Sequence, residues 1–113
     1  MAECLFCKIA ARDIAADVVA ETADLLAFRD VAPQAPTHVL VIPKRHISSV
    51  RELAPNDGPL VGEIFRLGAT VAADEGLEQG YRIVTNVGPD GGQTVDHLHF
   101  HLLGGRHMTW PPG

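Results

Sequence analysis

The sequence has few of the features that mark secreted, membrane-bound or nucleic-acid-binding proteins. Its 113 residues include 2 cysteines, and its 9 lysines and arginines are outnumbered by 14 acidic residues, which gives a net charge of −5. A nucleic-acid partner would need a basic stripe. No segment has the long apolar run of a membrane span, and the N-terminus lacks the layout of a secretory signal peptide. We therefore expect a cytoplasmic protein with no membrane and no nucleic-acid partner.

The length and the spacing of apolar residues predict one α+β domain. A chain of 113 residues with 46% hydrophobic content can bury a modest core. Alternating strand and helix signals predict a short helix in 4–13, strands in 17–21, 25–30 and 37–46, a long helix in 56–76, and strands in 81–87 and 96–105. The last two strands can pair as antiparallel neighbours, which predicts a mostly antiparallel sheet.

Histidines occupy every second position of the stretch DHLHFHLLGG. In a strand, His97, His99 and His101 would share one face, and the other face would carry the apolar residues Leu98, Phe100 and Leu102. The apolar face suits a core. Three imidazoles are costly to bury without partners, so their face should meet water, metal or substrate. The alternative is a half-exposed strand whose outward residues happen to be histidines.

The loop before these histidines has a composition that suits phosphate. It contains Asn86, Gly92, Gln93 and Thr94. Glycines let backbone N–H groups approach an anion, and amide and hydroxyl side chains add neutral donors. The same residue types also form ordinary hairpin connections, so the loop alone leaves both interpretations open.

Cys4 and Cys7 form a C-x-x-C pair near the N-terminus. Such a pair commonly supplies two of the four tetrahedral ligands of zinc, and His46 and His97 are candidates for the other two. A redox pair normally opens a helix after a strand, and no strand is predicted before this pair. Two free structural cysteines are the third alternative, and a disulfide suits a reducing compartment poorly.

These motifs together resemble the histidine triad (HIT) family. DHLHFHLL matches the family's His-x-His-x-His-x-x pattern, and LAFRDVAPQAPTHVLVIPKRHIS and NVGPDGGQTVDHLHFHLLGGRHMTWPPG are similar to its nucleotide-binding Hint branch. The resemblance implies a HIT-like α+β fold: a five-stranded antiparallel sheet, one long and one short helix, and a homodimer across which the sheet extends. It also implies a single domain over 1–113, with 104–113 as a C-terminal tail near the dimer partner's active site.

The resemblance implies a nucleotide-binding hydrolase that needs no organic cofactor. It would cleave the phosphorus–nitrogen bond of purine nucleoside phosphoramidates, of the AMP-amine or aminoacyl-adenylate type, through a nucleotidyl-histidine intermediate. The alternatives are a dinucleoside polyphosphate hydrolase and a nucleotide-responsive interaction module with incidental activity. A metal enzyme that uses the triad as ligands is a weaker alternative, because no carboxylate lies near enough in sequence to act as its base.

Residue roles follow from the same resemblance. His99 aligns with the nucleophile that attacks the α-phosphorus, His101 with a second imidazole that contacts phosphate, and His97 with the first member of the triad. A neutral imidazole can attack phosphorus through its free nitrogen lone pair, and a nearby imidazolium could protonate the leaving group. The substrate-binding residues would be Asp30 at the ribose, Leu5, Phe6, Ile9, Phe28 and Val31 at the base, Asn86, Gly92, Gln93 and Thr94 at the phosphate, and Trp110 at the partner's site.

The resemblance also bears on the metal and on departures from the family pattern. Some HIT proteins bind structural zinc through the positions of Cys4, Cys7, His46 and His97, whereas members without the cysteines use the equivalent histidines to support the nucleophile by hydrogen bonds. The complete quartet favours zinc.

Two positions depart from the family pattern. Asp96 stands where the branch often has an aromatic residue, and Arg29 stands where a histidine is common. The remaining histidines, His38 and His107, are expected to be solvated or structural rather than catalytic.

Overall fold

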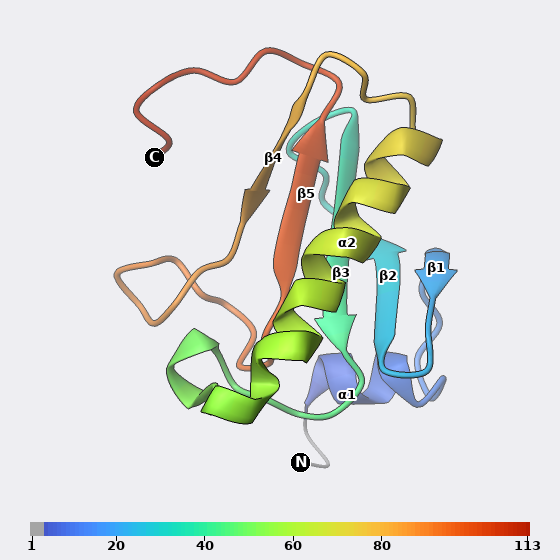
Figure 1. Cartoon of the computed structure of the whole chain (residues 1–113), viewed down its shortest axis with the longest axis vertical. Coiled ribbons are helices and arrows are strands. Elements are labelled where there is room, and N and C mark those ends of the chain that lie inside the picture. The colour runs from blue at the N-terminus through green and yellow to red at the C-terminus, as the bar shows by residue number, and fades with distance from the viewer. Residues whose placement is uncertain (1–3) are drawn as a thin grey trace.

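The centre of the protein is an antiparallel β-sheet (Figure 1). The computed structural model describes residues 4–113, in which five strands form one sheet in the spatial order β1-β2-β3-β5-β4. Every neighbouring pair is antiparallel. The strands are β1 (Val18–Glu21), β2 (Leu25–Arg29), β3 (Thr37–Pro43), β4 (Tyr81–Val84) and β5 (Phe100–Gly104). The predicted sheet is therefore confirmed, and the predicted domain of 1–113 includes three residues that lie outside the described part.

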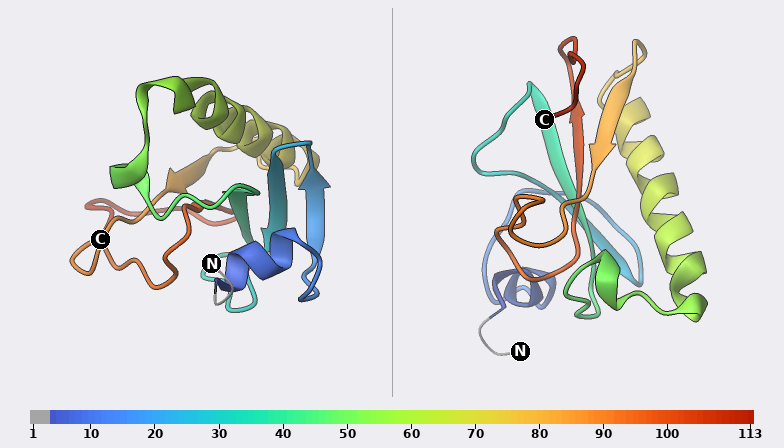
Figure 2. Two further views of the ribbon diagram at one scale, coloured as in Figure 1. Left: turned by 90° about the horizontal axis from the view of Figure 1, so that it is seen from below. Right: turned by 90° about the vertical axis from the view of Figure 1, so that its left-hand side faces the viewer.

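Two helices cover opposite faces of this sheet (Figure 2). The short helix α1 (Leu5–Ala10) lies against one face and the long helix α2 (Gly58–Asp74) against the other. Two short 3₁₀ helices, η1 (Val50–Glu52) and η2 (Pro55–Asp57), precede α2. Gly76 has a φ of +73° just after α2, which ends the helix as its glycine predicted. No helix among residues 4–113 has the length and apolarity that a membrane crossing requires.

The period of two along the strands divides the core into two layers. On the α2 face the odd-numbered residues of β2 and β3 and the even-numbered residues of the histidine segment meet the helix, in a cluster of Leu25, Ala27, Val39, Val41, Leu98, Phe100 and Leu102 with Ile64, Val71 and Ala72. On the α1 face the even-numbered residues of β2 and β3 form a second cluster, of Leu26, Phe28, Leu40 and Ile42 with Phe6 and Ile9. The strand β3 is buried on both faces, as its continuous apolar run predicted.

The histidine segment is only partly a strand, which corrects the expected strand over 96–105. The strand β5 begins at Phe100, so His97 and His99 precede it. The backbone hydrogen bonds of this part of the segment lie outside the sheet ladder. The Leu98 N–H donates to the Ile47 carbonyl oxygen at 2.6 Å, and the His99 carbonyl oxygen accepts from the Thr85 hydroxyl at 2.9 Å. The apolar residues of the segment still pack into the core, as the alternation predicted.

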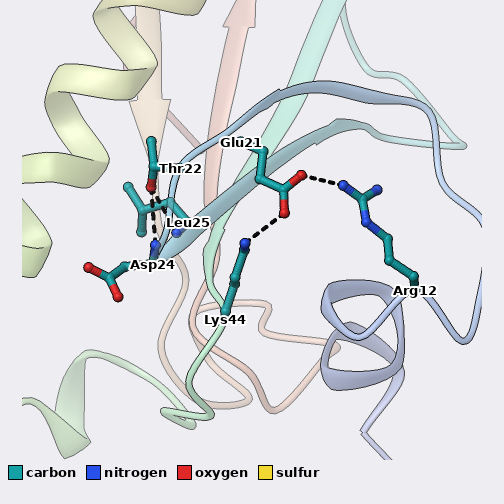
Figure 3. Close-up of polar contacts among 6 residues, drawn as sticks. All are labelled: Arg12, Glu21, Thr22, Asp24, Leu25 and Lys44. Carbon is teal, nitrogen blue, oxygen red and sulfur yellow. Dashed lines mark hydrogen bonds and ion pairs between the residues drawn. The ribbon is translucent and has the colours of Figure 1, made fainter.

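Polar contacts fix the edge of the sheet at the β1–β2 connection (Figure 3). The Glu21 carboxylate accepts hydrogen bonds from Arg12, which follows α1, and from Lys44, which follows β3. The hydroxyl of Thr22 accepts from the backbone N–H groups of Asp24 and Leu25. Exposed ion pairs contribute little stability because water screens the charges. Their main consequence is to tie the chain after α1 to the sheet edge.

Candidate active site and metal centre

A cavity of about 740 Å³ opens beside α1 and collects most of the predicted site residues. Its walls come from α1, the end of β2, the loop before the histidines and the start of β5. The predicted residues that line it are Leu5, Phe6, Ile9, Phe28, Asp30, Val31, Thr94, His99 and His101. Leu40, Val95 and the segment 14–17 also line it, and sequence reasoning missed them because they carry no distinctive pattern.

One wall of the cavity is an apolar slot. The Phe6 and Phe28 rings meet edge to face with centroids 5.6 Å apart, and Phe6 meets the His99 ring at 5.1 Å. Both phenylalanines are buried, whereas Val31 is fully exposed at the open end of the slot. A flat apolar slot beside a polar group is the usual form of a site for a small aromatic ligand.

Asp30 stands at the polar end of this slot, directly after β2. Its Oδ1 accepts a hydrogen bond from the Ala32 N–H at 2.8 Å, and its Oδ2 lies 3.4 Å from Nε2 of His38. The side chain is 20% exposed, so the carboxylate reaches the cavity without being fully hydrated. It can accept hydrogen bonds from ligand hydroxyl groups.

His99 is held in one tautomer by the backbone. Its Nδ1 lies 2.7 Å from the His97 carbonyl oxygen. A carbonyl only accepts hydrogen bonds, so Nδ1 carries the proton and Nε2 keeps a free lone pair. His99 lines the cavity with an oriented ring, and a neutral imidazole with a free nitrogen lone pair can act as a nucleophile.

The buried His38 and the partly buried His101 form a pair on the α1 face of the sheet. Nε2 of His38 lies 2.9 Å from Nδ1 of His101, and the Gln34 backbone N–H donates to Nδ1 of His38 at 3.0 Å. Burial lowers the pKa of both imidazoles, and that of His101 falls to about 4 with a further contribution from His99 and His38. His38 is thus buried, not solvated, whereas His107 is exposed.

The four predicted metal ligands converge behind the cavity. The ligand atoms of Cys4, Cys7, His46 and His97 all lie within 4.8 Å of one another. Nδ1 of His97 is 3.3 Å from the Cys4 sulfur, and Nδ1 of His46 is 3.3 Å from the Cys7 sulfur. Two sulfurs and two imidazole nitrogens are a donor set that tetrahedral zinc prefers.

The tautomer of His97 suits a metal ligand. Its Nε2 lies 2.8 Å from the Pro43 carbonyl oxygen and must donate to it, so the lone pair on Nδ1 faces the two cysteine sulfurs. Burial lowers the pKa of this imidazole, which favours the neutral form that binds metals. The His97 ring does not line the cavity, and this residue contacts His99 through its backbone carbonyl.

Hydrogen bonds of the Gln93 side chain stabilise the loop before the histidines. The Gln93 side chain accepts from the Gly88 N–H and donates to the carbonyl oxygens of Ser48 and Val95, so its amide supports the loop. A Cβ on Gly91 would lie 2.4 Å from the Val87 carbonyl oxygen, so this position requires glycine. Other predicted site residues lie outside the cavity lining: Asn86, Gly92, Gln93 and Trp110, the last of which is 81% exposed.

The comparisons with known proteins agree with this fold. A sequence model of the HIT domain matches residues 11–108. An uncharacterised HIT-like protein of Synechococcus elongatus is 55% identical over 109 residues, which cover 96% of each chain, and a 14 kDa zinc-binding protein of Zea mays is 47% identical, covering 96% of this chain and 87% of its own. The crystal structure of a HIT family hydrolase from Legionella pneumophila superimposes with a TM-score of 0.96 at 54% identity, covering 98% of this chain and 100% of its own. The chain therefore belongs to the HIT family.

Proposed function

We propose that this protein is a nucleotide-binding hydrolase that cleaves the phosphorus–nitrogen bond of purine nucleoside phosphoramidates. The observation that carries the proposal is the orientation of His99, whose Nδ1–H is bound by the His97 carbonyl at 2.7 Å so that the lone pair on Nε2 is free. The similar Legionella protein is described as a HIT family hydrolase, which supports hydrolysis as the general activity.

Different residues of the cavity would bind the base, the ribose and the phosphate of the nucleotide. The purine would lie in the apolar slot against the paired rings of Phe6 and Phe28, with the ribose hydroxyls on the Asp30 carboxylate. In that order the α-phosphate would lie beside His99 and His101, which line the same cavity. Thr94 also lines it and offers a hydroxyl donor to the phosphoryl oxygens.

The reaction would proceed in two displacements. Nε2 of His99 attacks the α-phosphorus, a phosphorus–Nε2 bond forms, and the bond to the amine breaks with its electron pair leaving on the amine, which takes a proton from water. Water then attacks the nucleotidyl-histidine, releases the nucleoside monophosphate and restores the neutral imidazole. Because the pKa of His101 is lowered to about 4, this residue would act as a neutral hydrogen-bond donor to the phosphoryl group, in keeping with the expected imidazole that contacts phosphate, and not as the imidazolium that protonates the leaving group.

We also propose that Cys4, Cys7, His46 and His97 hold a structural zinc ion. When bound, zinc would supply a cross-link between α1, the segment after β3 and the histidine segment. The Zea mays relative is described as a zinc-binding protein, and the geometry of the four donors supports the same for this chain. Zinc-ligating thiolates persist in a reducing compartment, which supports the expected cytoplasmic location. The donors serve a structural role because none of them reaches the reacting atoms.

We propose a homodimer through the β4 edge of the sheet. The strand β4 is the last in the sheet order, so its outer backbone groups can pair with a second copy. Tyr81 on β4 and Phe65 on α2 are both exposed apolar side chains, 42% and 46% respectively. The C-terminal end of the chain lies far from α1 in Figure 1. Trp110 is 81% exposed, and we propose that it approaches the active site of the partner subunit.

The proposed reaction is tested by assays with adenosine 5′-phosphoramidate and a diadenosine polyphosphate side by side. The wild type should prefer the phosphoramidate, and acid quenching during turnover should trap labelled nucleotide on the protein. His99→Ala should bind AMP but neither turn over nor trap label, whereas His107→Ala, which changes an exposed histidine, should behave as the wild type. Turnover by His99→Ala would refute the mechanism. If the wild type prefers the diadenosine polyphosphate, it is the alternative polyphosphate hydrolase. If the wild type binds both compounds and turns over neither, it is the nucleotide-responsive interaction module.

A further inference from the structure

We propose that His38 is a positioning residue, which fixes the proton of His101 on the nitrogen that faces the substrate phosphate. The inference rests on the proposed function only for the identity of the ligand. It starts from a pair of residues 63 positions apart that the β3–β5 register brings together. Leu40 lies opposite His101 and His38 opposite Leu103, so the two imidazoles are diagonal neighbours on the α1 face.

The first link is the backbone of the turn between β2 and β3. The Gln34 N–H donates to Nδ1 of His38 at 3.0 Å. A backbone N–H cannot accept a hydrogen bond, so Nδ1 of His38 must be the unprotonated nitrogen. A neutral imidazole has one proton, and that proton of His38 is therefore on Nε2.

The second link transfers this choice to His101. Nε2 of His38 lies 2.9 Å from Nδ1 of His101 and 3.4 Å from Oδ2 of Asp30. The shorter contact takes the hydrogen bond, so Nδ1 of His101 accepts and Nε2 of His101 carries the proton. The reverse direction would leave His38 with no proton on either nitrogen, which is an imidazolate anion.

The third link is an unused donor. Nε2 of His101 is buried and has no hydrogen-bond partner; among residues 4–113 it is the one buried side-chain nitrogen or oxygen atom in this state. Buried donors are nearly always paired in native proteins, and exceptions often mark functional positions. His101 lines the cavity beside His99, with ring centroids 5.0 Å apart, so a phosphoryl oxygen bound at His99 is the partner that the geometry offers.

The charges around the pair keep both rings neutral. The groups that face His101 are Asp30, His38 and His99; the carboxylate raises its pKa, whereas burial and the two imidazoles lower it to about 4. Burial also lowers the pKa of His38 against the opposing effect of Asp30. The chain of single hydrogen bonds is thus maintained at neutral pH.

The direct test is the protonation of both imidazoles in the whole protein, read by ¹⁵N NMR without substrate. The wild type should show a proton on Nε2 and none on Nδ1 for His38 and His101 at neutral pH. A His101 proton on Nδ1, or on both nitrogens, would overturn the proposal. This measurement does not depend on turnover, so an inactive wild type would refute the proposed function and leave the inference intact.

Two substitutions separate positioning from a purely structural role. His38→Leu removes the donor and leaves His101 buried, so the His101 proton should no longer be confined to Nε2 in the ¹⁵N spectrum, and kcat should fall about 10- to 100-fold, as for other lost supporting partners. His38→Gln keeps an acceptor for the Gln34 N–H and a donor for His101, so it should restore most of kcat and return the His101 proton to Nε2. A purely structural His38 would lower stability in both variants and leave the His101 proton on Nε2 in both, and that result would overturn the proposal. If His38→Leu fails to fold, the tautomers of His101 in the wild type and in His38→Gln still decide.

Discussion

Asp30→Asn removes a charge from the proposed ribose site and changes little else. Oδ1 of Asp30 accepts from the Ala32 N–H at 2.8 Å, and Oδ1 of an asparagine can keep that bond. The turn after β2 should therefore survive. What is lost is the negative charge on Oδ2, the oxygen that lies near His38 and remains available to ligand hydroxyls.

The expected loss follows from the difference between charged and neutral hydrogen bonds. A bond to a charged group contributes about 1.5–3 kcal/mol and a neutral bond about 0.5–1.5 kcal/mol. The Asp30 side chain is 20% exposed, so water screens it only in part. For one or two ribose hydroxyls the loss is about 1–3 kcal/mol, which is about a 5- to 150-fold weaker Kd for AMP.

Calorimetric titration of the wild type and of Asp30→Asn, each with AMP and with 2′,3′-dideoxy-AMP, forms a double-mutant cycle. The wild type should bind dideoxy-AMP more weakly than AMP, and Asp30→Asn should show a much smaller difference between the two ligands. Asp17→Asn is the matched control, because this substitution changes the net charge by the same amount. Asp17 lines the same cavity, but its side chain is 74% exposed. Equal affinity of the wild type for the two ligands would refute the assignment of Asp30 to the ribose.

The metal centre, the loop and the buried imidazoles are tested separately. Replacing Cys4 and Cys7 together with serine should remove about one zinc per chain in elemental analysis and lower the melting temperature; a variant that retains its zinc would contradict the ligand set. Gly91→Ala should weaken AMP binding in calorimetry, because its Cβ would lie 2.4 Å from the Val87 carbonyl oxygen, and unchanged affinity would show that the loop does not shape the site. The free energy of unfolding should fall as the pH is lowered from about 6.5 to about 4, because the unfolded chain takes up a proton that His101 resists in the folded state. Urea titrations of His101→Gln should show a shallower dependence in this range, and an equally steep one would assign the effect to other groups.

Local patterns in the sequence were sufficient to predict much of this protein. The continuous apolar run of 39–42 predicted a strand buried on both faces, because no polar side chain interrupts it, and Leu98, Phe100 and Leu102 pack in the core as their alternation with the histidines predicted. Sequence resemblance predicted the HIT fold, which the sheet and the comparisons confirm.

The tertiary structure decided what each imidazole does. Sequence alternation treats His97, His99 and His101 as equivalent, but the strand begins only at Phe100. The His97 ring therefore turns to the cysteines, while its carbonyl orients His99. Sequence periodicity carries no information about which distant backbone groups will meet each ring.

His38 shows the same limit most clearly. In the sequence it is an isolated histidine in an apolar strand, with no spacing that links it to the triad. Its partner is set by the register of β3 against β5, which places His38 diagonally across from His101. Its tautomer is set by the turn that brings the Gln34 N–H to Nδ1. Residue types thus determined which chemistry was available, and long-range hydrogen bonds determined the nitrogen on which each proton resides.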